Sequence, residues 1–226
     1  MDKELEKLKV AYEREDNTTI QRYGMCFDYL RFCVHTLENA MGRILMSIGY
    51  PKYLNEYKLF LDIGCGDGET LRKWVKFGAR PTNCYGIDVL ESRVSFAKSL
   101  HPNMNIVLGN GKTLPYPDRM FDVVSIFVVL SNVETDEGRT QILSEAKRVL
   151  KPGGFIMIYE QNEKINGGRN RGISKDKLKE MSGIDWFFVD IIPNNCRHLS
   201  YENIFKLATK TKDFLCYVAL AKKGAK

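Results

Sequence analysis

The sequence predicts an α/β fold in which helices cover one mostly parallel, doubly wound sheet of seven strands. Short apolar runs alternate with helix-forming segments between residues 59 and 159, and that order produces a parallel sheet with crossover helices. Two further apolar runs follow in the C-terminal part, which predicts an antiparallel strand at the edge of the sheet. A helical segment precedes the first strand.

The expected strands are short apolar runs, mostly rich in β-branched and aromatic residues. The run at residues 121–129 is long enough to form a central strand. In chain order the seven strands are Leu59–Ile63, Tyr85–Asp88, Asn105–Leu108, Phe121–Val129, Phe155–Tyr159, Trp186–Ile192 and Phe214–Ala221.

Four segments between the strands read as helices. The clearest is Asp136–Leu150, whose apolar residues lie on one face and which Pro152-Gly153-Gly154 brings to an end. The other expected helices are Thr70–Phe77, Glu91–Leu100 and Lys175–Met181.

An apolar stripe precedes the first strand. Such a stripe can seed a coiled coil, but it spans only about three heptads and stops at Gly49-Tyr50-Pro51, which favours packing on the sheet. We therefore expect residues 1–50 to form a helical cap of the same domain and residues 51–226 to form its core. The stripe consists of Phe27, Leu30, Val34, Leu37, Met41, Ile44 and Ile48.

The most informative segment follows the first strand and reads Asp62-Ile63-Gly64-Cys65-Gly66-Asp67-Gly68-Glu69. Glycines at alternate positions allow a sharp turn and a close approach of backbone to ligand. The helix that follows presents unpaired N–H groups at its N-terminus. The segment therefore predicts a site for a nucleotide-like cofactor.

Two kinds of cofactor fit such a turn. A dinucleotide fingerprint needs a third glycine at the sixth position of G-x-G-x-x-G, and this chain has Glu69 there. S-adenosylmethionine (SAM) has no pyrophosphate and instead carries a sulfonium, an ammonium, a carboxylate and a ribose diol. Asp62 beside a turn rich in backbone donors suits those groups better.

The segment resembles motif I of the class I SAM-dependent methyltransferases, and the similarity extends from about Tyr12 to Ala221. This resemblance implies SAM as cofactor, S-adenosylhomocysteine (SAH) as product and a Rossmann-like methyltransferase fold. It also rests on the segments Phe77–Pro81, Gly86–Asp88, Leu114–Asp122 and Arg148–Gly154.

Other segments resemble a subgroup of small stand-alone bacterial methyltransferases of glycan and secondary-metabolite pathways. They are Tyr12-Glu13-Arg14, residues 130–136 with Arg139, Arg171-Gly172-Ile173 and residues 193–197. The chain departs from that subgroup at Glu160, where members usually carry Asp, and at Asn194-Asn195-Cys196, which replaces a second proline before the arginine. The resemblance implies methyl transfer to oxygen on a sugar-like or polyketide-like small molecule.

The expected cofactor contacts lie at the ends of the first four strands and near the N-terminus. Asp88 ends the second strand, where a carboxylate can accept hydrogen bonds from both ribose hydroxyls. Asn110-Gly111 is either an adenine contact or a simple Asn-Gly turn, and Phe127 is either an adenine wall or core. Tyr12, Arg14 and Tyr23 form a lid or a structural helix. The full set comprises Asp62, Gly64, Cys65, Gly66, Gly68, Asp88, Val89, Asn110, Gly111, Phe127, Arg14 and Tyr12.

The acceptor site is predicted from fewer signals. His198 and Glu160 are the candidate catalytic residues, as groups that bind or deprotonate an acceptor, although a surface histidine also explains His198. Arg169, Arg171 and Arg197 are candidates for clamping an acceptor phosphate or carboxylate, with surface solvation as the alternative. No pattern of paired carboxylates suggests a metal.

Composition restricts the partners. A net charge of +6 is spread over scattered lysines without interleaved aromatics, so nucleic acid is not the expected partner. The six cysteines include no C-x-x-C pair and no apolar run reaches the length of a membrane span, so we expect a cytoplasmic monomer or homodimer. Methylation of RNA or protein, and a non-catalytic SAM-binding subunit, remain the alternatives.

Overall fold

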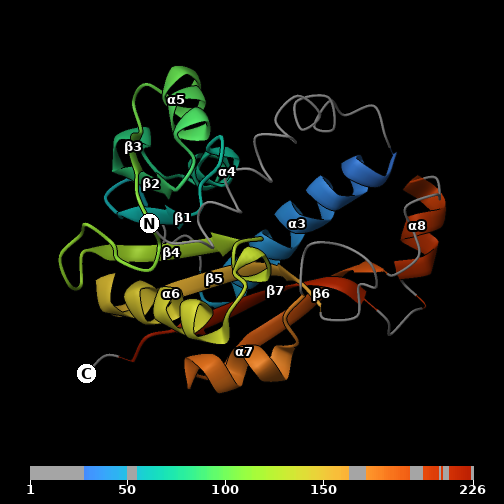
Figure 1. Cartoon of the computed structure of the whole chain (residues 1–226). Coiled ribbons are helices and arrows are strands. Elements are labelled where there is room, and N and C mark those ends of the chain that lie inside the picture. The colour runs from blue at the N-terminus through green and yellow to red at the C-terminus, as the bar shows by residue number, and fades with distance from the viewer. Residues whose placement is uncertain are drawn as a thin grey trace.

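The computed structural model describes residues 28–49, 55–162, 172–193, 201–208, 210 and 214–224. Its centre is a seven-stranded sheet with the strand order β3-β2-β1-β4-β5-β7-β6 (Figure 1). The strands are β1 (Phe60–Ile63), β2 (Cys84–Asp88), β3 (Asn105–Leu108), β4 (Phe121–Phe127), β5 (Leu150–Gln161), β6 (Phe187–Pro193) and β7 (Phe214–Lys222).

The sheet is parallel from β3 to β5, and β7 runs antiparallel to both of its neighbours. The predicted doubly wound, mostly parallel sheet is therefore confirmed. The antiparallel strand is not the edge strand itself, because β7 lies between β5 and the edge strand β6.

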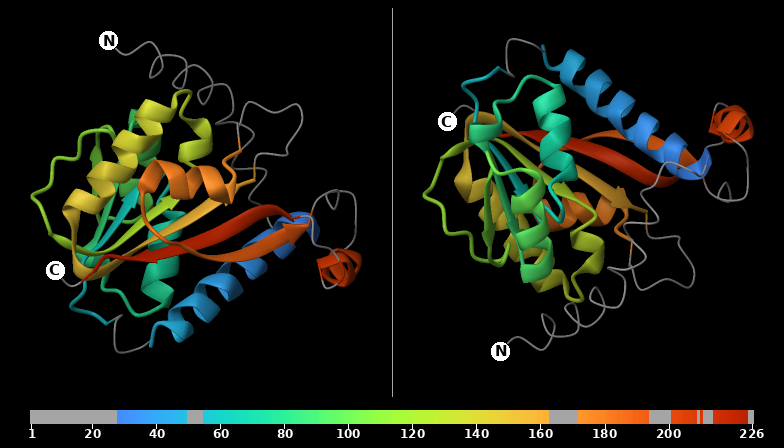
Figure 2. Two further views of the ribbon diagram at one scale, coloured as in Figure 1. Left: turned by 90° about the horizontal axis from the view of Figure 1, so that it is seen from below. Right: turned by 90° about the horizontal axis from the view of Figure 1, so that it is seen from above.

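Helices cover both faces of the sheet (Figure 2). One face carries α3 (Asp28–Ser47), α4 (Glu69–Lys76) and α5 (Glu91–Leu100), and the other carries α6 (Asp136–Val149) and α7 (Lys175–Ser182). A helix absent from the sequence prediction, α8 (Tyr201–Ala208), packs against α3 and β6. Two short 3-10 helices, η1 (Pro81–Asn83) and η2 (Leu130–Asn132), complete the described elements.

The described part of the N-terminal stripe packs on the sheet as predicted, and Phe27 lies outside the described residues. Leu37, Met41 and Ile44 of α3 are buried in the core that this helix shares with α4 and the sheet. Trp74 of α4 lies in the same core, with its ring centroid 5.5 Å from that of Phe60. Each such side chain contributes about 1.5–3 kcal/mol through removal of apolar surface from water.

The end of α6 differs slightly from the prediction. The helix ends at Val149, and Leu150 already pairs with Phe121 of β4. Pro152 and the glycines after it therefore lie inside β5, with Gly153 at a φ of 77°. Thr135 begins α6 by accepting a hydrogen bond from Gly138 N at 3.1 Å, which is a standard N-cap.

The strand order reverses at β1, which has β2 on one side and β4 on the other. In a doubly wound sheet the ligand crevice lies beyond the carboxyl ends of the strands at that point. The turns after β1, β2, β3 and β4 therefore form the candidate site.

Candidate cofactor site

The glycine turn after β1 has a left-handed backbone, and this conformation requires glycine. Gly64 and Gly68 have φ values of 73° and 86°, a region that residues with a Cβ rarely adopt. A Cβ on Gly64 would lie 2.4 Å from Val129 Cγ2, and one on Gly68 would lie 2.7 Å from His101 Cδ2. The turn is thus closely packed on both sides.

The acid that ends β2 fastens this turn. Asp88 Oδ2 accepts a hydrogen bond from Gly66 N at 2.9 Å, and its Oδ1 accepts one from Leu90 N at 3.0 Å. Asp88 is 7% exposed. A carboxylate has about four acceptor positions, so the remaining ones fit the two hydroxyls of a ribose. Val89 follows it and is partly buried.

Asp62 lies under the turn and is shielded from water. Its Oδ1 accepts a hydrogen bond from Ser125 Oγ at 2.6 Å, and Ser125 in turn accepts one from Trp74 Nε1 at 3.2 Å. Burial raises the pKa of Asp62 to about 7, and the negative charge of Asp88 adds to the effect. The neighbouring Cys65 is also buried, and burial raises the pKa of its thiol.

The turn after β3 lies beside the first. Gly109 N donates to Asp88 O at 2.9 Å, and a Cβ on Gly111 would lie 2.6 Å from Ile63 Cγ2. Asn110 Oδ1 accepts a hydrogen bond from Lys112 N at 3.0 Å, which is an Asx turn. The structure thus has the Asn-Gly turn, while the adenine contact stays a prediction.

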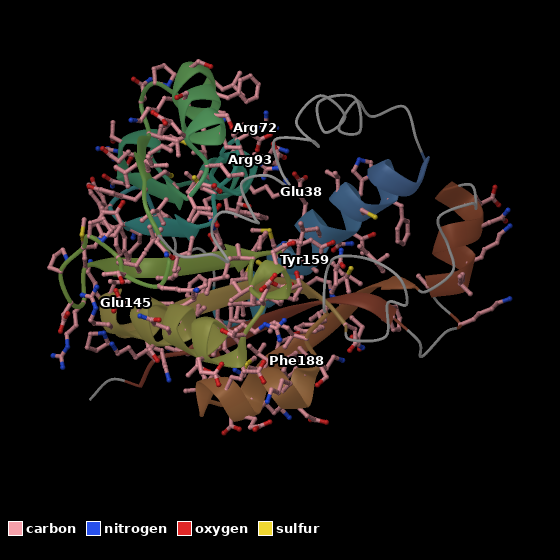
Figure 3. The ribbon with its side chains drawn as sticks, viewed as in Figure 1. Glu38, Arg72, Arg93, Glu145, Tyr159 and Phe188 are labelled. Carbon is pink, nitrogen blue, oxygen red and sulfur yellow. The ribbon has the colours of Figure 1, made fainter. Side chains whose placement is uncertain are left out.

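The segment that leads into β4 is held by two residues of α6, which the sequence analysis did not identify. Glu145, which is labelled in Figure 3, accepts a hydrogen bond through Oε2 from Leu114 N at 2.7 Å. Arg148 donates to Tyr116 O at 2.8 Å and to Leu114 O at 3.2 Å, and it forms an ion pair with Asp118. The spacing of Glu145 and Arg148 on one helix face was the available signal, but their target loop lies about 30 residues away in sequence.

The end of β4 contains strained backbone. Val128 has a φ of 56° although it is β-branched, and such residues rarely adopt positive φ. Phe127, the predicted adenine wall, is partly buried with its ring centroid 5.8 Å from that of Tyr159. Its packing fits the core interpretation, and the adenine contact remains a prediction.

Glu160 lies near the end of β5 and is completely buried. Its Oε1 accepts hydrogen bonds from Leu130 N at 2.7 Å and Ser131 N at 3.4 Å. Burial raises the pKa of Glu160 to about 7. In this position the carboxyl group supports the turn after β4, and it has no exposed surface with which to meet an acceptor.

Several predicted residues lie outside the described part of the chain. They are Tyr12, Arg14, Tyr23, Arg169, Arg171, Arg197 and His198. The structure gives no position for the predicted lid, for the arginine clamp or for the histidine, and these roles stay predictions.

The described residues fit SAM by their chemistry. Glycine keeps three positions of the turn free of side chains, and Asp88 keeps acceptor positions for a diol. Asp62 adds a buried carboxyl group two residues before the turn. Within the described ranges, no three His, Cys, Asp or Glu residues form a group that could hold a metal ion.

Comparison with known proteins agrees with this reading. Residues 61–158, from β1 to β5, match the methyltransferase domain family. Over these residues the chain is therefore similar to methyltransferase domains, and its sheet has the strand order of the Rossmann-like methyltransferase fold. No helix in the described ranges has the length and apolar character needed to cross a membrane.

Two curated proteins illustrate the sequence similarity. A sterol 24-C-methyltransferase of Gibberella zeae is 31% identical over 173 residues, which cover 67% of this chain and 44% of the relative. A ubiquinone/menaquinone biosynthesis C-methyltransferase of Campylobacter jejuni is 30% identical over 120 residues, 51% of this chain and 50% of the relative. The chain thus spans about half the length of these relatives.

A solved structure supports the fold over nearly the whole chain. A SAM-dependent methyltransferase of Thermotoga maritima superposes with a TM-score of 0.66 and 17% sequence identity, covering 94% of this chain and 98% of the other. At that identity the likeness concerns the fold alone.

Proposed function

We propose that this protein transfers a methyl group from SAM to a small-molecule acceptor. The observation that carries the proposal is the bond between Asp88 and Gly66, which joins a diol-binding acid to a left-handed glycine turn within a methyltransferase domain. This arrangement suits the ribose and the amino-acid end of SAM together.

The reaction is an in-line displacement. A lone pair of the acceptor forms a bond to the methyl carbon while the carbon–sulfur bond breaks, and its electrons return to sulfur to give SAH. Alignment supplies much of the acceleration. When the acceptor atom carries a proton, that proton passes to a base or to water; His198 is our candidate for the base.

The acceptor class follows from two sources. The sequence resemblance favours oxygen on a sugar-like or polyketide-like molecule, whereas both curated relatives are C-methyltransferases by name. We propose a hydroxylated small molecule, in which oxygen is the first candidate and an electron-rich carbon beside it the second. The candidate clamp of Arg169, Arg171 and Arg197 favours an acceptor that bears a phosphate or carboxylate.

Two measurements test the proposal. Calorimetry should give micromolar binding of SAM and SAH, and absence of binding for both would refute the cofactor assignment. Incubation of the protein and trideuteromethyl-SAM with fractionated cell extract should label a small molecule, and NMR of the product would identify the methylated atom. Label in RNA or protein instead would establish the macromolecular alternative.

A further inference from the structure

A carboxyl group that is fully shielded from water lies where β4 and β5 end. Only one oxygen of Glu160 is used: Oε1 accepts from Leu130 N and Ser131 N. Within the part of the chain that the structure describes, Oε2 has no hydrogen-bond partner. An ionised carboxylate in this position would be a buried charge that these hydrogen bonds compensate only in part.

The backbone that Glu160 holds is the turn after β4, residues 128–133, and other side chains hold it as well. Asn132 Nδ2 donates to Val128 O at 2.6 Å. Arg139 Nε, from α6, donates to Leu130 O and Val133 O, each at 3.0 Å. The strained φ of Val128 persists only where surrounding contacts fix it, and these bonds supply that constraint.

This turn abuts the cofactor site. Val129 Cγ2 lies 2.4 Å from the position that a Cβ on Gly64 would take. The Val129 side chain is therefore in direct contact with the first glycine of the turn after β1. The protein interior is close-packed. A displacement of the turn after β4 would therefore move Val129 and change the space available to the glycine turn.

The surroundings favour the uncharged acid. Burial is the main cause that raises the pKa of Glu160, and the Ser131 side chain together with backbone N–H groups only partly offsets it. Arg139, the cation that bonds to this turn, uses Nε on the two carbonyl groups and NH1 on Asp136 at 3.1 Å. On α7, Lys177 pairs with the same Asp136 at 3.0 Å. On β7, Tyr217, the strand partner of Glu160, donates its hydroxyl to Ile173 O at 2.9 Å.

We propose that Glu160 is a positioning residue that acts as a neutral acid and holds the turn after β4 against the glycine turn of the cofactor site. The inference rests on the proposed function for its consequence, because the turn matters to catalysis only if SAM binds there. It assigns Glu160 a role other than direct deprotonation of the acceptor.

The test compares Glu160→Gln and Glu160→Ala with wild type. The glutamine side chain keeps an acceptor for Leu130 N and carries no charge, whereas alanine leaves that buried donor unpaired. Gln161→Ala, at the next position of β5, serves as the matched control. Hydrogen exchange of the amides at residues 129–133 and calorimetry with SAH are measured for all four proteins.

We expect Glu160→Ala to speed exchange in the turn by at least about tenfold and to weaken SAH binding by about five- to twentyfold. Glu160→Gln and Gln161→Ala should stay within about twofold of wild type. Tight SAH binding and unchanged exchange in folded Glu160→Ala would overturn the proposal. So would a glutamine variant that behaves like alanine, since it would show that the carboxylate charge is needed.

A pH series keeps the test decisive if the alanine variant does not fold. Corrected for intrinsic rates, protection of residues 129–133 in wild type should fall about three- to tenfold from pH 6 to pH 8 as Glu160 ionises. In Glu160→Gln the fall should be clearly smaller, and equal slopes in both proteins would refute the neutral-acid role. Failure of wild type to bind SAH would instead count against the proposed function, while the exchange data would still judge the role of Glu160 in the turn.

Discussion

Asp88 Oδ2 accepts a hydrogen bond from Gly66 N at 2.9 Å, so the acid that ends β2 closes the glycine turn that follows β1. The other oxygen accepts from Leu90 N at the start of α5. One carboxylate therefore connects two strand ends before any ligand arrives. Pre-arranged polar groups of this kind reduce the ordering cost of binding.

Replacement of Asp88 by alanine should weaken SAH binding by at least about tenfold, because the turn loses its fastening and the ribose loses its acceptor. Asp88→Asn should lose less, since it keeps one carbonyl oxygen. Calorimetry measures both effects. Asp176 on α7 is exposed and distant in sequence from Asp88. The control variant Asp176→Asn should therefore bind SAH as wild type does. Undiminished binding in Asp88→Ala would contradict this account of the site.

Gly64→Ala should also impair the site, for two separable reasons. The φ of 73° disfavours any Cβ, and Val129 Cγ2 occupies its space at 2.4 Å. We expect a loss of about 2–4 kcal/mol in unfolding free energy, measured by urea denaturation. Adding Val129→Ala to the Gly64→Ala variant should recover the part of the lost unfolding free energy that the clash causes.

Gly183→Ala gives the reference for the conformational part alone. Gly183 has a φ of 64°, and nothing lies within 4 Å of a Cβ there. Gly183→Ala should lower the free energy of unfolding by about 1 kcal/mol. If Gly64→Ala costs no more than Gly183→Ala, the contact between Gly64 and Val129 has no energetic weight.

Asp62 should make SAM binding depend on pH. Its pKa is raised to about 7 from an ordinary value of 3.8, so the folded protein keeps a proton that the unfolded chain loses near pH 4. This carboxyl therefore lowers stability as pH rises from about 4 to about 7. A cationic ligand favours the ionised form, so SAM binding should release protons and tighten as pH rises through 7.

Calorimetry in buffers of different ionisation enthalpy measures that release. The groups that act on Asp62 are Ser125 on β4, Asp88 on β2, and Thr70 and Lys73 on α4. Asp62→Asn removes the titrating group and should remove most of the proton release at pH 6.5. Equal release in wild type and Asp62→Asn would assign the protons to another group.

The elements were predictable where one local signal dominates. The bounds of α5 and β3 agree with the prediction because each is a short periodic segment bounded by turn residues. The glycine turn was predictable because few other sequences permit its backbone. Asp88 was predictable as a strand-end acid, although its bond to Gly66 joins residues 22 positions apart.

The features that were not predictable depend on tertiary packing. Nothing in the sequence marks Val128 for positive φ, since β-branched residues disfavour it; contacts from β5 and α6 impose that conformation. In the sequence Glu160 is a strand-end acid able to meet an acceptor, whereas in the fold it is buried and accepts a hydrogen bond from Leu130 N of η2. α8 was not predicted; it packs against β6, the element before it, and against α3, which is distant in sequence.

The loop before β4 provides the last prediction, because two groups on α6 hold it. Arg148 bonds to the carbonyls of Tyr116 and Leu114, and Glu145 accepts from Leu114 N. The half-buried Arg148 also pairs with Glu145 and with exposed Asp118. Because surface pairs contribute little, the bonds to loop carbonyls should carry most of the effect.

Arg148→Met keeps the apolar stem of the side chain and removes its donors. We expect a loss of about 1–2 kcal/mol in unfolding free energy and faster hydrogen exchange at residues 114–119. Asp118→Asn removes one ion pair while leaving the carbonyl bonds in place, and it should cost less than about 0.5 kcal/mol. If the two variants lose equal stability, the surface ion pair rather than the bonds to the loop holds this segment in place.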